Sequence, residues 1–434
     1  MDINSIIRKK RSKKELKEEE IKLFIGKYTK GEVTEAQAGA LLSYIYINGL
    51  TENEIINFAK QMAESGEKLD LSDISDKIVD KHGTGGVGDK VSLILIPTIA
   101  ALGLPVAKVS SRGLGISGGT IDKLEAIPGF DTQISLEEFK ENIKKVGASI
   151  INQTFNIAPA EKKIYKLRNE IGCNDSIPII AASLLSLKIA TGSNKIVFDI
   201  SCGKGTYLKT KDEAIRLAKI LIKLAKKLNK DVGCAITIMD EPLGYAIGDN
   251  LEMIETINSL QGKMPQDVGD VVVALGSIIL KLSGYSEDLK QNAIVIKDTI
   301  KSGKAFEKFK EIVAAQYGYL EYVENVEKFK EAKYQIPVYA SENGTIEQID
   351  ADIIGSIAKY LGAGRMDDEK EVDKTAGIVL NKKIGDIVSI GEIVAIVHAN
   401  DESKALSSTK ILAEAFKITN KKVQIKSKII QILK

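Results

Sequence analysis

Two glycine-rich segments hold the residues of this chain whose types and spacing could do chemistry. They are KHGTGGVGDKVS, residues 81–92, and SSRGLGISGGTIDKLE, residues 110–125. Each combines glycine with hydroxyl and cationic side chains. A bound phosphate group needs all three, because it takes close backbone N–H groups, hydroxyl donors and fixed positive charge. The side chains that could supply these contacts are Lys81, Ser92, Ser110, Ser111, Arg112 and Thr120. The two segments therefore predict a site for phosphate or a phosphate ester.

The first segment also fits the G-x-G-x-x-G pattern of dinucleotide-binding folds, through Gly83, Gly85 and Gly88. Its context does not fit, because the next expected strand ends in Ser110, where the ribose of NAD would need an acidic residue. It is not a Walker loop either, since no G-K-[ST] sequence closes it. The pattern therefore predicts a phosphate loop and no organic cofactor.

Alternating strand and helix patterns must position both segments. From Ile78 onward, apolar runs such as KIVFDIS alternate with amphipathic runs such as DEAIRLAKILIKLAKK. This rhythm predicts an α/β domain with a mostly parallel sheet that is covered by helices on both faces. A strand–loop–helix–strand–loop–helix unit would bring both glycine-rich segments to the same edge of that sheet.

The remaining patterns predict two smaller domains. Residues 1–70 carry apolar side chains at helical spacing and predict a small all-helical domain of three amphipathic helices, completed by a helical stretch at about 161–192. Residues 71–160 and 193–330 would then form the α/β phosphate-binding domain. Residues 331–434 contain short β-like pieces with glycine turns, and they predict a C-terminal α+β domain.

The composition of the chain argues against nucleic acid and membranes as partners. The chain has 434 residues and a formal net charge of +2, without the basic excess typical of nucleic-acid binders. Its longest uncharged run, residues 91–107, is interrupted by Pro97 and Gly103 and is too short to span a membrane. Charged residues near Met1 argue against an export signal. Three cysteines without a C-x-x-C pair are typical of a reducing compartment. We therefore expect a cytoplasmic protein that binds neither nucleic acid nor membranes.

The segments KHGTGGVGD and SSRGLGISGGTIDKLEAIPGF resemble the paired signatures of the thymidine and pyrimidine-nucleoside phosphorylases. Lys108 lies just ahead of the second segment, at a position where the pyrimidine-nucleoside branch carries lysine, so the chain resembles that branch. The resemblance extends to the three-domain order. It implies a homodimer that catalyses phosphorolysis of uridine, thymidine or deoxyuridine. Phosphate displaces the base at C1′ with inversion, which gives a free pyrimidine and an α-pentose 1-phosphate.

The resemblance also implies roles for individual residues. His82 and Arg168 would be catalytic, with His82 facing the pyrimidine. The phosphate ligands would be Lys81, His82, Gly83, Ser92, Lys108, Ser110 and Thr120. The substrate contacts would come from Arg168, Ser183, Leu187 and Lys188. A potassium ion is implied at Gly88, Lys90, Leu243, Ala246 and Glu255. Asp122 and Glu125 are expected to hold their loop by pairing with Lys123 or with backbone N–H groups.

Four positions depart from the family pattern. Gly83 replaces a serine that contacts phosphate, and Leu187 replaces a base-contacting lysine, with Lys188 one residue late. Ser201 replaces the lysine of a D-V-K-x-G-x-G pattern, and Lys90 stands where a hydroxyl residue is common. Two alternatives therefore stay open beside the phosphorylase: a phosphoribosyltransferase-like enzyme on the same fold, and a non-catalytic nucleoside-binding paralogue. The Lys90 ammonium group could also replace the potassium ion.

Overall fold

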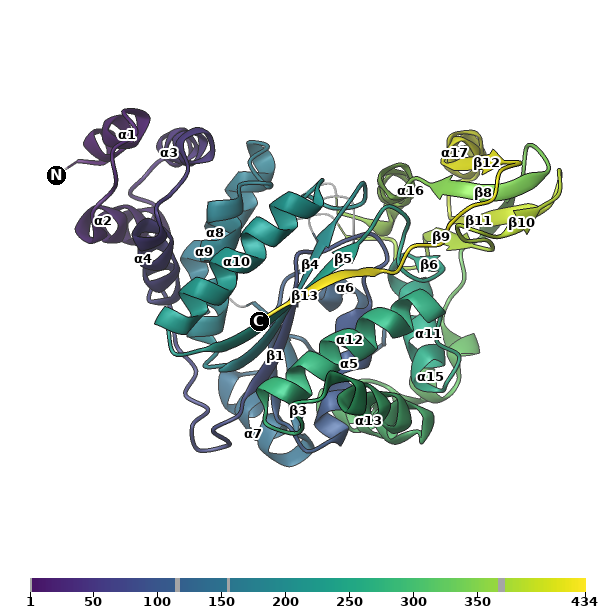
Figure 1. The fold of residues 1–434 in the computed structure, drawn as a ribbon, viewed down its shortest axis with the longest axis horizontal. Coiled ribbons are helices and arrows are strands. Elements are labelled where there is room, and N and C mark those ends of the chain that lie inside the picture. Colours follow the sequence, from purple (N-terminus) through teal and green to yellow (C-terminus); the bar gives the residue numbers. More distant parts are fainter. Residues whose placement is uncertain (1, 114–117, 154–156, 366–370) are drawn as a thin grey trace.

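A six-stranded sheet forms the centre of the molecule (Figure 1). In this computed structural model, which describes residues 2–113, 118–153, 157–365 and 371–434, the strand order is β13-β5-β4-β1-β2-β3. The strands are β1 (Val79–Gly83), β2 (Val106–Ser110), β3 (Ala148–Asn152), β4 (Lys195–Cys202), β5 (Asp231–Ile238) and β13 (Ile429–Leu433). Strands β1 to β5 run parallel, and only β13 is antiparallel to its neighbour. The expected mostly parallel sheet is confirmed.

Helices cover both faces of this sheet, as Figure 1 shows for α10 and α12. One face packs against α9 (Ile177–Ala190) and α10 (Lys211–Lys227), and the other packs against α5 (Val91–Ala101) and α12 (Gln266–Leu282). Successive side chains of a strand point to opposite faces. In β4, Phe198 accordingly belongs to the core with α10, while Val197 belongs to the core with α12. This two-sided burial explains the nearly continuous apolar strand sequences.

The N-terminal region forms four helices rather than the three expected. They are α1 (Ile3–Arg11), α2 (Glu18–Thr29), α3 (Glu35–Asn48) and α4 (Glu52–Ala63). The missed break follows Arg11, where Ser12 caps α1 and Lys13 adopts a left-handed backbone with φ 59°. The chain returns to these helices through α8 (Pro159–Glu170) and α9, which pack against α2 and α4.

The other helices of the central part are α6 (Thr120–Leu124), α7 (Leu136–Val146), α11 (Asp249–Leu260), α13 (Leu289–Lys301), α14 (Lys304–Ala315), α15 (Leu320–Glu324) and η1 (Val326–Lys328). Beyond them lie β7 (Tyr334–Tyr339), β8 (Gly344–Ile349), α16 (Ala351–Ala358), η2 (Lys359–Ala363), β9 (Gly377–Leu380), β10 (Ile387–Val388), β11 (Ile393–Ala399), α17 (Glu402–Glu414) and β12 (Phe416–Thr419). Within the described residues, no helix is both long enough and apolar enough to span a membrane.

Two strands pair with a sheet that lies on the other side of the domain boundary expected near residue 330. Strand β6 (Ala246–Ile247) lies in the central part of the sequence but pairs with β9 in the four-stranded sheet β6-β9-β11-β7. Strand β13 lies in the last residues but pairs with β5 of the central sheet. The expectation that residues 331–434 form one separate C-terminal unit is therefore wrong for the last strand. Figure 1 shows this strand running back beside β5.

Candidate active site at the carboxyl edge of the sheet

Most of the predicted site residues line one cavity beyond the carboxyl ends of β1 and β2. Strand β1 ends at Gly83, and the chain passes through the first glycine loop into α5, which begins after Lys90. Strand β2 ends at Ser110, and α6 begins at Thr120. The cavity is lined by Lys81, His82, Gly83, Ser92, Lys108, Ser110, Thr120, Arg168, Ser183 and Leu187. Sequence reasoning thus located both glycine loops and the residues that face them.

The first glycine loop packs closely against its neighbours at two of its positions. Gly88 has φ +78°, and a Cβ atom there would lie 2.5 Å from the carbonyl oxygen of Leu243. A Cβ atom at Gly86 would lie 2.6 Å from the Cε of Met239. Position 88 requires glycine, because the oxygen atom it meets is backbone and φ is positive, whereas the methionine side chain beside Gly86 could move aside. The loop therefore leaves its N–H groups close to the cavity, as an anion site requires.

Lys81 supplies a permanent charge to this cavity. Its ammonium nitrogen lies 3.5 Å from Asp89 Oδ2 and 3.6 Å from Asp199 Oδ2. Burial alone would lower the pKa of Lys81, but the two carboxylates outweigh it and the pKa is raised. A Cβ atom at Gly83 would lie only 3.0 Å from this nitrogen. Glycine at position 83 therefore gives Lys81 room to reach both carboxylates.

Asp122 and Glu125 hold the second glycine loop in place. Asp122 Oδ2 accepts hydrogen bonds from the N–H groups of Gly113 (2.7 Å) and Gly119 (3.1 Å), which confirms the backbone pairing expected for it. Glu125 Oε1 accepts from Arg112 at 2.6 Å, a partner other than the Lys123 or backbone N–H groups expected for these two carboxylates. Lys123 instead forms an ion pair with Glu252 and donates to the carbonyl of Asp89. Residues 114–117 of this motif lie outside the described part of the chain.

Lys108 lies under the first loop with an unusual charge balance. Its ammonium group donates to the Lys81 carbonyl at 2.6 Å, and Asp80 Oδ1 is 3.7 Å away. Burial lowers the pKa of Lys108 to about 7; Asp80 opposes this shift, whereas the cations of Lys188 and Lys81 reinforce it. Lys108 therefore changes its charge close to neutral pH.

His82 and Arg168 each leave a buried polar atom free for a ligand. The Nδ1 of His82 and the Nε of Arg168 have no hydrogen-bond partner among the described residues. Burial lowers the pKa of His82 well below its usual value, and the cations of Lys188, Lys108 and Lys81 lower it further, so the imidazole is neutral. Arg168 donates through Nη2 to the carbonyl of Asn174 at 2.9 Å. Buried orphan polar atoms are rare, and here they point to a polar ligand.

A hydrogen-bond chain joins the second glycine loop to the opposite wall. Ser111 donates to Gln153 Oε1 at 3.1 Å, Gln153 donates to Glu161 Oε2 at 2.9 Å, and Ser183 donates to Glu161 Oε1 at 2.5 Å. Burial raises the pKa of Glu161, against the hydrogen bonds from Ser183 and Gln153. Sequence reasoning missed Gln153 and Glu161. A signal existed, because Glu161 shares a helical face with the buried Ile164 and Arg168 at spacings of three and seven.

Three family models match consecutive parts of the chain. A model described as "Glycosyl transferase family, helical bundle domain" matches residues 4–66, and "Glycosyl transferase family, a/b domain" matches residues 75–306. "Pyrimidine nucleoside phosphorylase C-terminal domain" matches residues 345–419. The pyrimidine-nucleoside phosphorylase of Bacillus subtilis (strain 168) is 42% identical over 421 residues, which cover 96% of this chain and 97% of the relative. That of Staphylococcus aureus (strain USA300) is 40% identical over 419 residues, 95% of this chain and 97% of the relative.

The chain belongs to the pyrimidine-nucleoside phosphorylase family. Among solved structures, the anthranilate phosphoribosyltransferase of Thermus thermophilus is similar with a TM-score of 0.58 at 20% identity. The match covers 73% of this chain and 99% of the other. At this identity the likeness shows a shared fold.

Leu187, one of the departures from the family pattern, lines the cavity, whereas Lys188 does not. Leu187 lines the cavity together with Ile180 and Leu184. Lys188 is fully buried on another face of α9, where its ammonium group forms an ion pair with Asp80. One residue rotates a helix position by about 100°, which accounts for the different directions. Lys188 therefore does not take the place of the missing family lysine.

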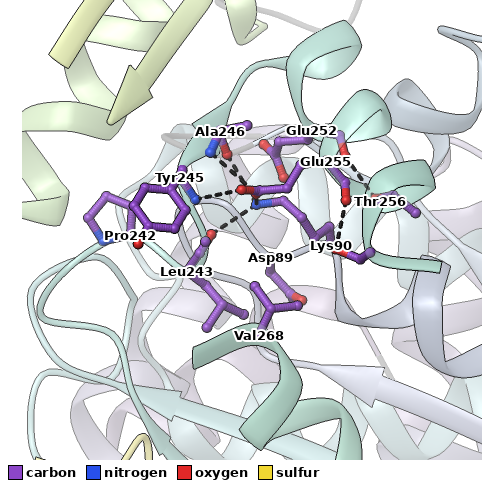
Figure 2. A network of polar contacts seen from close by, with 12 residues as sticks. Asp89, Lys90, Pro242, Leu243, Tyr245, Ala246, Glu252, Glu255, Thr256 and Val268 are labelled. Carbon is purple, nitrogen blue, oxygen red and sulfur yellow. Dashed lines mark hydrogen bonds and ion pairs between the residues drawn. The ribbon is translucent and has the colours of Figure 1, made fainter. Parts of the chain in front are cut away.

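The residues expected to bind potassium do converge, but around the ammonium group of Lys90 (Figure 2). Lys90 Nζ lies 2.9 Å from the carbonyl oxygen of Leu243, 3.1 Å from that of Ala246 and 2.6 Å from Glu255 Oε2. Gly88 adjoins this cluster through its contact with the Leu243 backbone. Because an ammonium ion already occupies the centre of these oxygen atoms, the site does not fit a metal ion.

Removing single hydroxyl groups from the loops tests the phosphate site. We expect Ser110→Ala and Thr120→Ala each to raise the Michaelis constant for phosphate about tenfold or more, because a hydroxyl bond to a dianion contributes about 1.5–3 kcal/mol. Steady-state kinetics with varied phosphate measures this. Thr299→Ala is the control, since its hydroxyl donates to the carbonyl of Val295 within the same helix, α13. Wild-type phosphate dependence in both loop variants would place the anion elsewhere.

Separate substitutions at residues 187 and 188 test the part of the cavity where the base is expected to bind. We expect Leu187→Lys to raise kcat, because a cation near the leaving base stabilises the charge that develops in the transition state. Lys188→Met should instead lower the free energy of unfolding by about 3–5 kcal/mol, because it removes the closest cation of the buried Asp80 and leaves only the more distant Lys108. Kinetics and chemical denaturation separate the two effects. A stable Lys188→Met protein with crippled kcat would contradict this assignment.

Proposed function

We propose that this protein catalyses the reversible phosphorolysis of pyrimidine nucleosides to a free pyrimidine and an α-pentose 1-phosphate. The observation that carries the proposal is the single cavity in which both glycine loops face His82, Arg168 and Ser183. The orphan nitrogen atoms of His82 and Arg168 supply a reason for a polar ligand there. The relatives named pyrimidine-nucleoside phosphorylase support the choice of reaction.

In the proposed reaction, a phosphate oxygen attacks C1′ of the pentose while the bond from C1′ to the base nitrogen breaks. The bonding electrons leave with the base, which then takes a proton. No covalent enzyme intermediate is needed, so the residues act by positioning and by charge. Lys81, Ser110 and Thr120 would hold the phosphate beneath C1′. Arg168 would stabilise the negative charge of the departing base, and the neutral His82 would donate or accept one hydrogen bond to it.

A phosphoribosyltransferase is the less supported alternative. It has the fold of the Thermus enzyme in its favour, but that likeness carries no information on the reaction at 20% identity. A non-catalytic nucleoside-binding paralogue has one specific observation in its favour. Leu187 makes the wall beside the expected base position apolar, where the resemblance implies a lysine.

We propose further that the protein acts as a homodimer in the cytoplasm, without an organic cofactor. The exposed Tyr46 and Ile47 on α3 offer apolar contact area near the N-terminal helices. The cysteines at 173, 202 and 234 are all buried and free, which suits a reducing compartment. We retain the division near residues 70 and 330 as a proposal, apart from β13. Potassium takes no part in the proposed reaction, because Lys90 occupies its position.

Product analysis tests the reaction directly. We expect purified protein with phosphate and uridine or thymidine to release uracil or thymine together with the pentose 1-phosphate, and to leave purine nucleosides unchanged. Chromatography of the products at several phosphate concentrations measures this. A parallel incubation with phosphoribosyl pyrophosphate and free pyrimidines tests the phosphoribosyltransferase. Nucleoside binding by calorimetry without any product would identify the non-catalytic paralogue.

The charge of Lys108 predicts a pH dependence. Its pKa is lowered from 10.5 to about 7, so Lys108 is cationic below that value and neutral above it. We expect the ratio of wild-type to Lys108→Met kcat/KM for phosphate to fall from about pH 6 to about pH 8, since kcat/KM reports the free enzyme. The ionisation of phosphate itself cancels in this ratio. A ratio that stays constant across this range would show that Lys108 does not contribute charge to phosphate binding.

A further inference from the structure

Lys90 lies in a cage of oxygen atoms at the foot of the first glycine loop. Its side chain is fully buried, and its ammonium nitrogen contacts the carbonyl oxygens of Leu243 and Ala246 and the carboxylate of Glu255. Figure 2 shows all three groups pointing toward this nitrogen. An ammonium group has three N–H donors, and each finds one oxygen at 2.6–3.1 Å. The cage thus matches the donor number of Lys90.

Backbone N–H groups hold the carboxylate of Glu255 in place within the cage. Glu255 also accepts from the N–H groups of Tyr245 at 2.9 Å and Ala246 at 3.3 Å. A Cβ atom at Gly244, where φ is +71°, would lie 2.4 Å from Glu255 Oε2 and 2.8 Å from Lys90 Nζ. Only glycine therefore fits at the wall of this cage. Burial would lower the pKa of Lys90, but Glu255 and Glu252 outweigh it and the pKa is raised, so the group is cationic.

The cage connects three parts of the molecule. Lys90 is the N-cap residue of α5, whose first turn carries Ser92 of the candidate phosphate site. Glu255 belongs to α11. Ala246 belongs to β6, which pairs with β9 of the C-terminal sheets. One buried cation therefore holds the glycine loop against the segment that leads to the C-terminal sheets.

We propose that the ammonium group of Lys90 is a built-in cation that replaces an exchangeable monovalent metal ion. Backbone carbonyl and carboxylate oxygens are the ligands that hard cations prefer, and carbonyl oxygens replace the water shell of potassium in its binding sites. Here the same set of oxygens surrounds a tethered charge. The contact between the glycine loop and the C-terminal sheets is consequently independent of the salt around the protein.

The wild-type protein provides the first test. Its thermal unfolding is measured in potassium, sodium and tetramethylammonium chloride at equal ionic strength. We expect the same Tm in all three salts, because no ion has to enter the cage. A Tm that rises with potassium in a saturable way, over the other two salts, would overturn the proposal. This readout does not depend on the proposed reaction.

The variant Lys90→Ser provides the second test, because it removes the charge and opens the cage. We expect a lower Tm in tetramethylammonium chloride and a saturable increase with potassium chloride, since an ion that binds only the folded state stabilises it. The Michaelis constant for phosphate should rise and recover in parallel. A variant as stable as wild type in tetramethylammonium would show that the cage needs no cation, and would overturn the proposal.

Lys10→Ser is the matched control. Lys10 is also buried and bonds to both carboxylate oxygens of Glu54, at 2.7 and 2.9 Å, but no backbone carbonyl of the described residues accepts a hydrogen bond from its ammonium group. We expect this variant to lose stability without recovery in potassium. If Lys90→Ser behaves in the same way, Lys90 is an ordinary buried ion pair and the proposal is wrong. If Lys90→Ser does not fold, the salt series on the wild-type protein decides.

Discussion

Positive charge buried at the carboxyl edge of the sheet is the constraint on which the rest of the site depends. Five lysines there are at most 2% exposed: Lys81, Lys90, Lys108, Lys123 and Lys188. A charge that is taken out of water destabilises the folded state unless a partner and hydrogen bonds compensate it. The fold supplies carboxylates from neighbouring strands and helices for each lysine. Two of these lysines, Lys81 and Lys108, line the candidate cavity and can therefore present charge to an anion there.

Carboxylates compensate the buried positive charges to different degrees, so the pKa values of Lys81, Lys108 and His82 shift differently. Lys81 has two carboxylates within 3.6 Å and keeps its proton. Burial lowers the pKa of Lys108 to about 7, because its nearest carboxylate, Asp80 at 3.7 Å, is contacted more closely by Lys188 and compensates the burial only in part. Burial lowers the pKa of His82 well below its usual value and these three cations lower it further, so His82 stays neutral. A neutral imidazole suits a hydrogen bond to an uncharged pyrimidine better than an imidazolium would, since it adds no charge to desolvate.

Features that depend on residue type and on the spacing of apolar residues could be predicted from the sequence. Features that depend on contacts between residues far apart in the chain could not. Glycine, hydroxyl and lysine in two short loops identified the candidate site, and the βα rhythm identified the sheet. The return of β13 to β5 was missed because a local strand pattern does not show which sheet the strand joins, and the two strands are far apart in the sequence. The cage of Lys90 could only be raised as an alternative to potassium, since its three partners lie 153 to 165 residues away. The fourth N-terminal helix was missed because the break after Arg11 contains neither glycine nor proline.

The departures from the family pattern mainly change where positive charge lies in the site. Lysine is absent at 187 and 201, while Lys90 adds a charge at the foot of the first loop. Leu187 makes the wall beside the expected base position apolar, together with Ile180 and Leu184. A hydrogen bond is electrostatically stronger where the local dielectric is low. The proposed contact of Arg168 with a departing base would therefore gain strength from the same substitution that removes a second cation, which would offset part of the loss of the lysine.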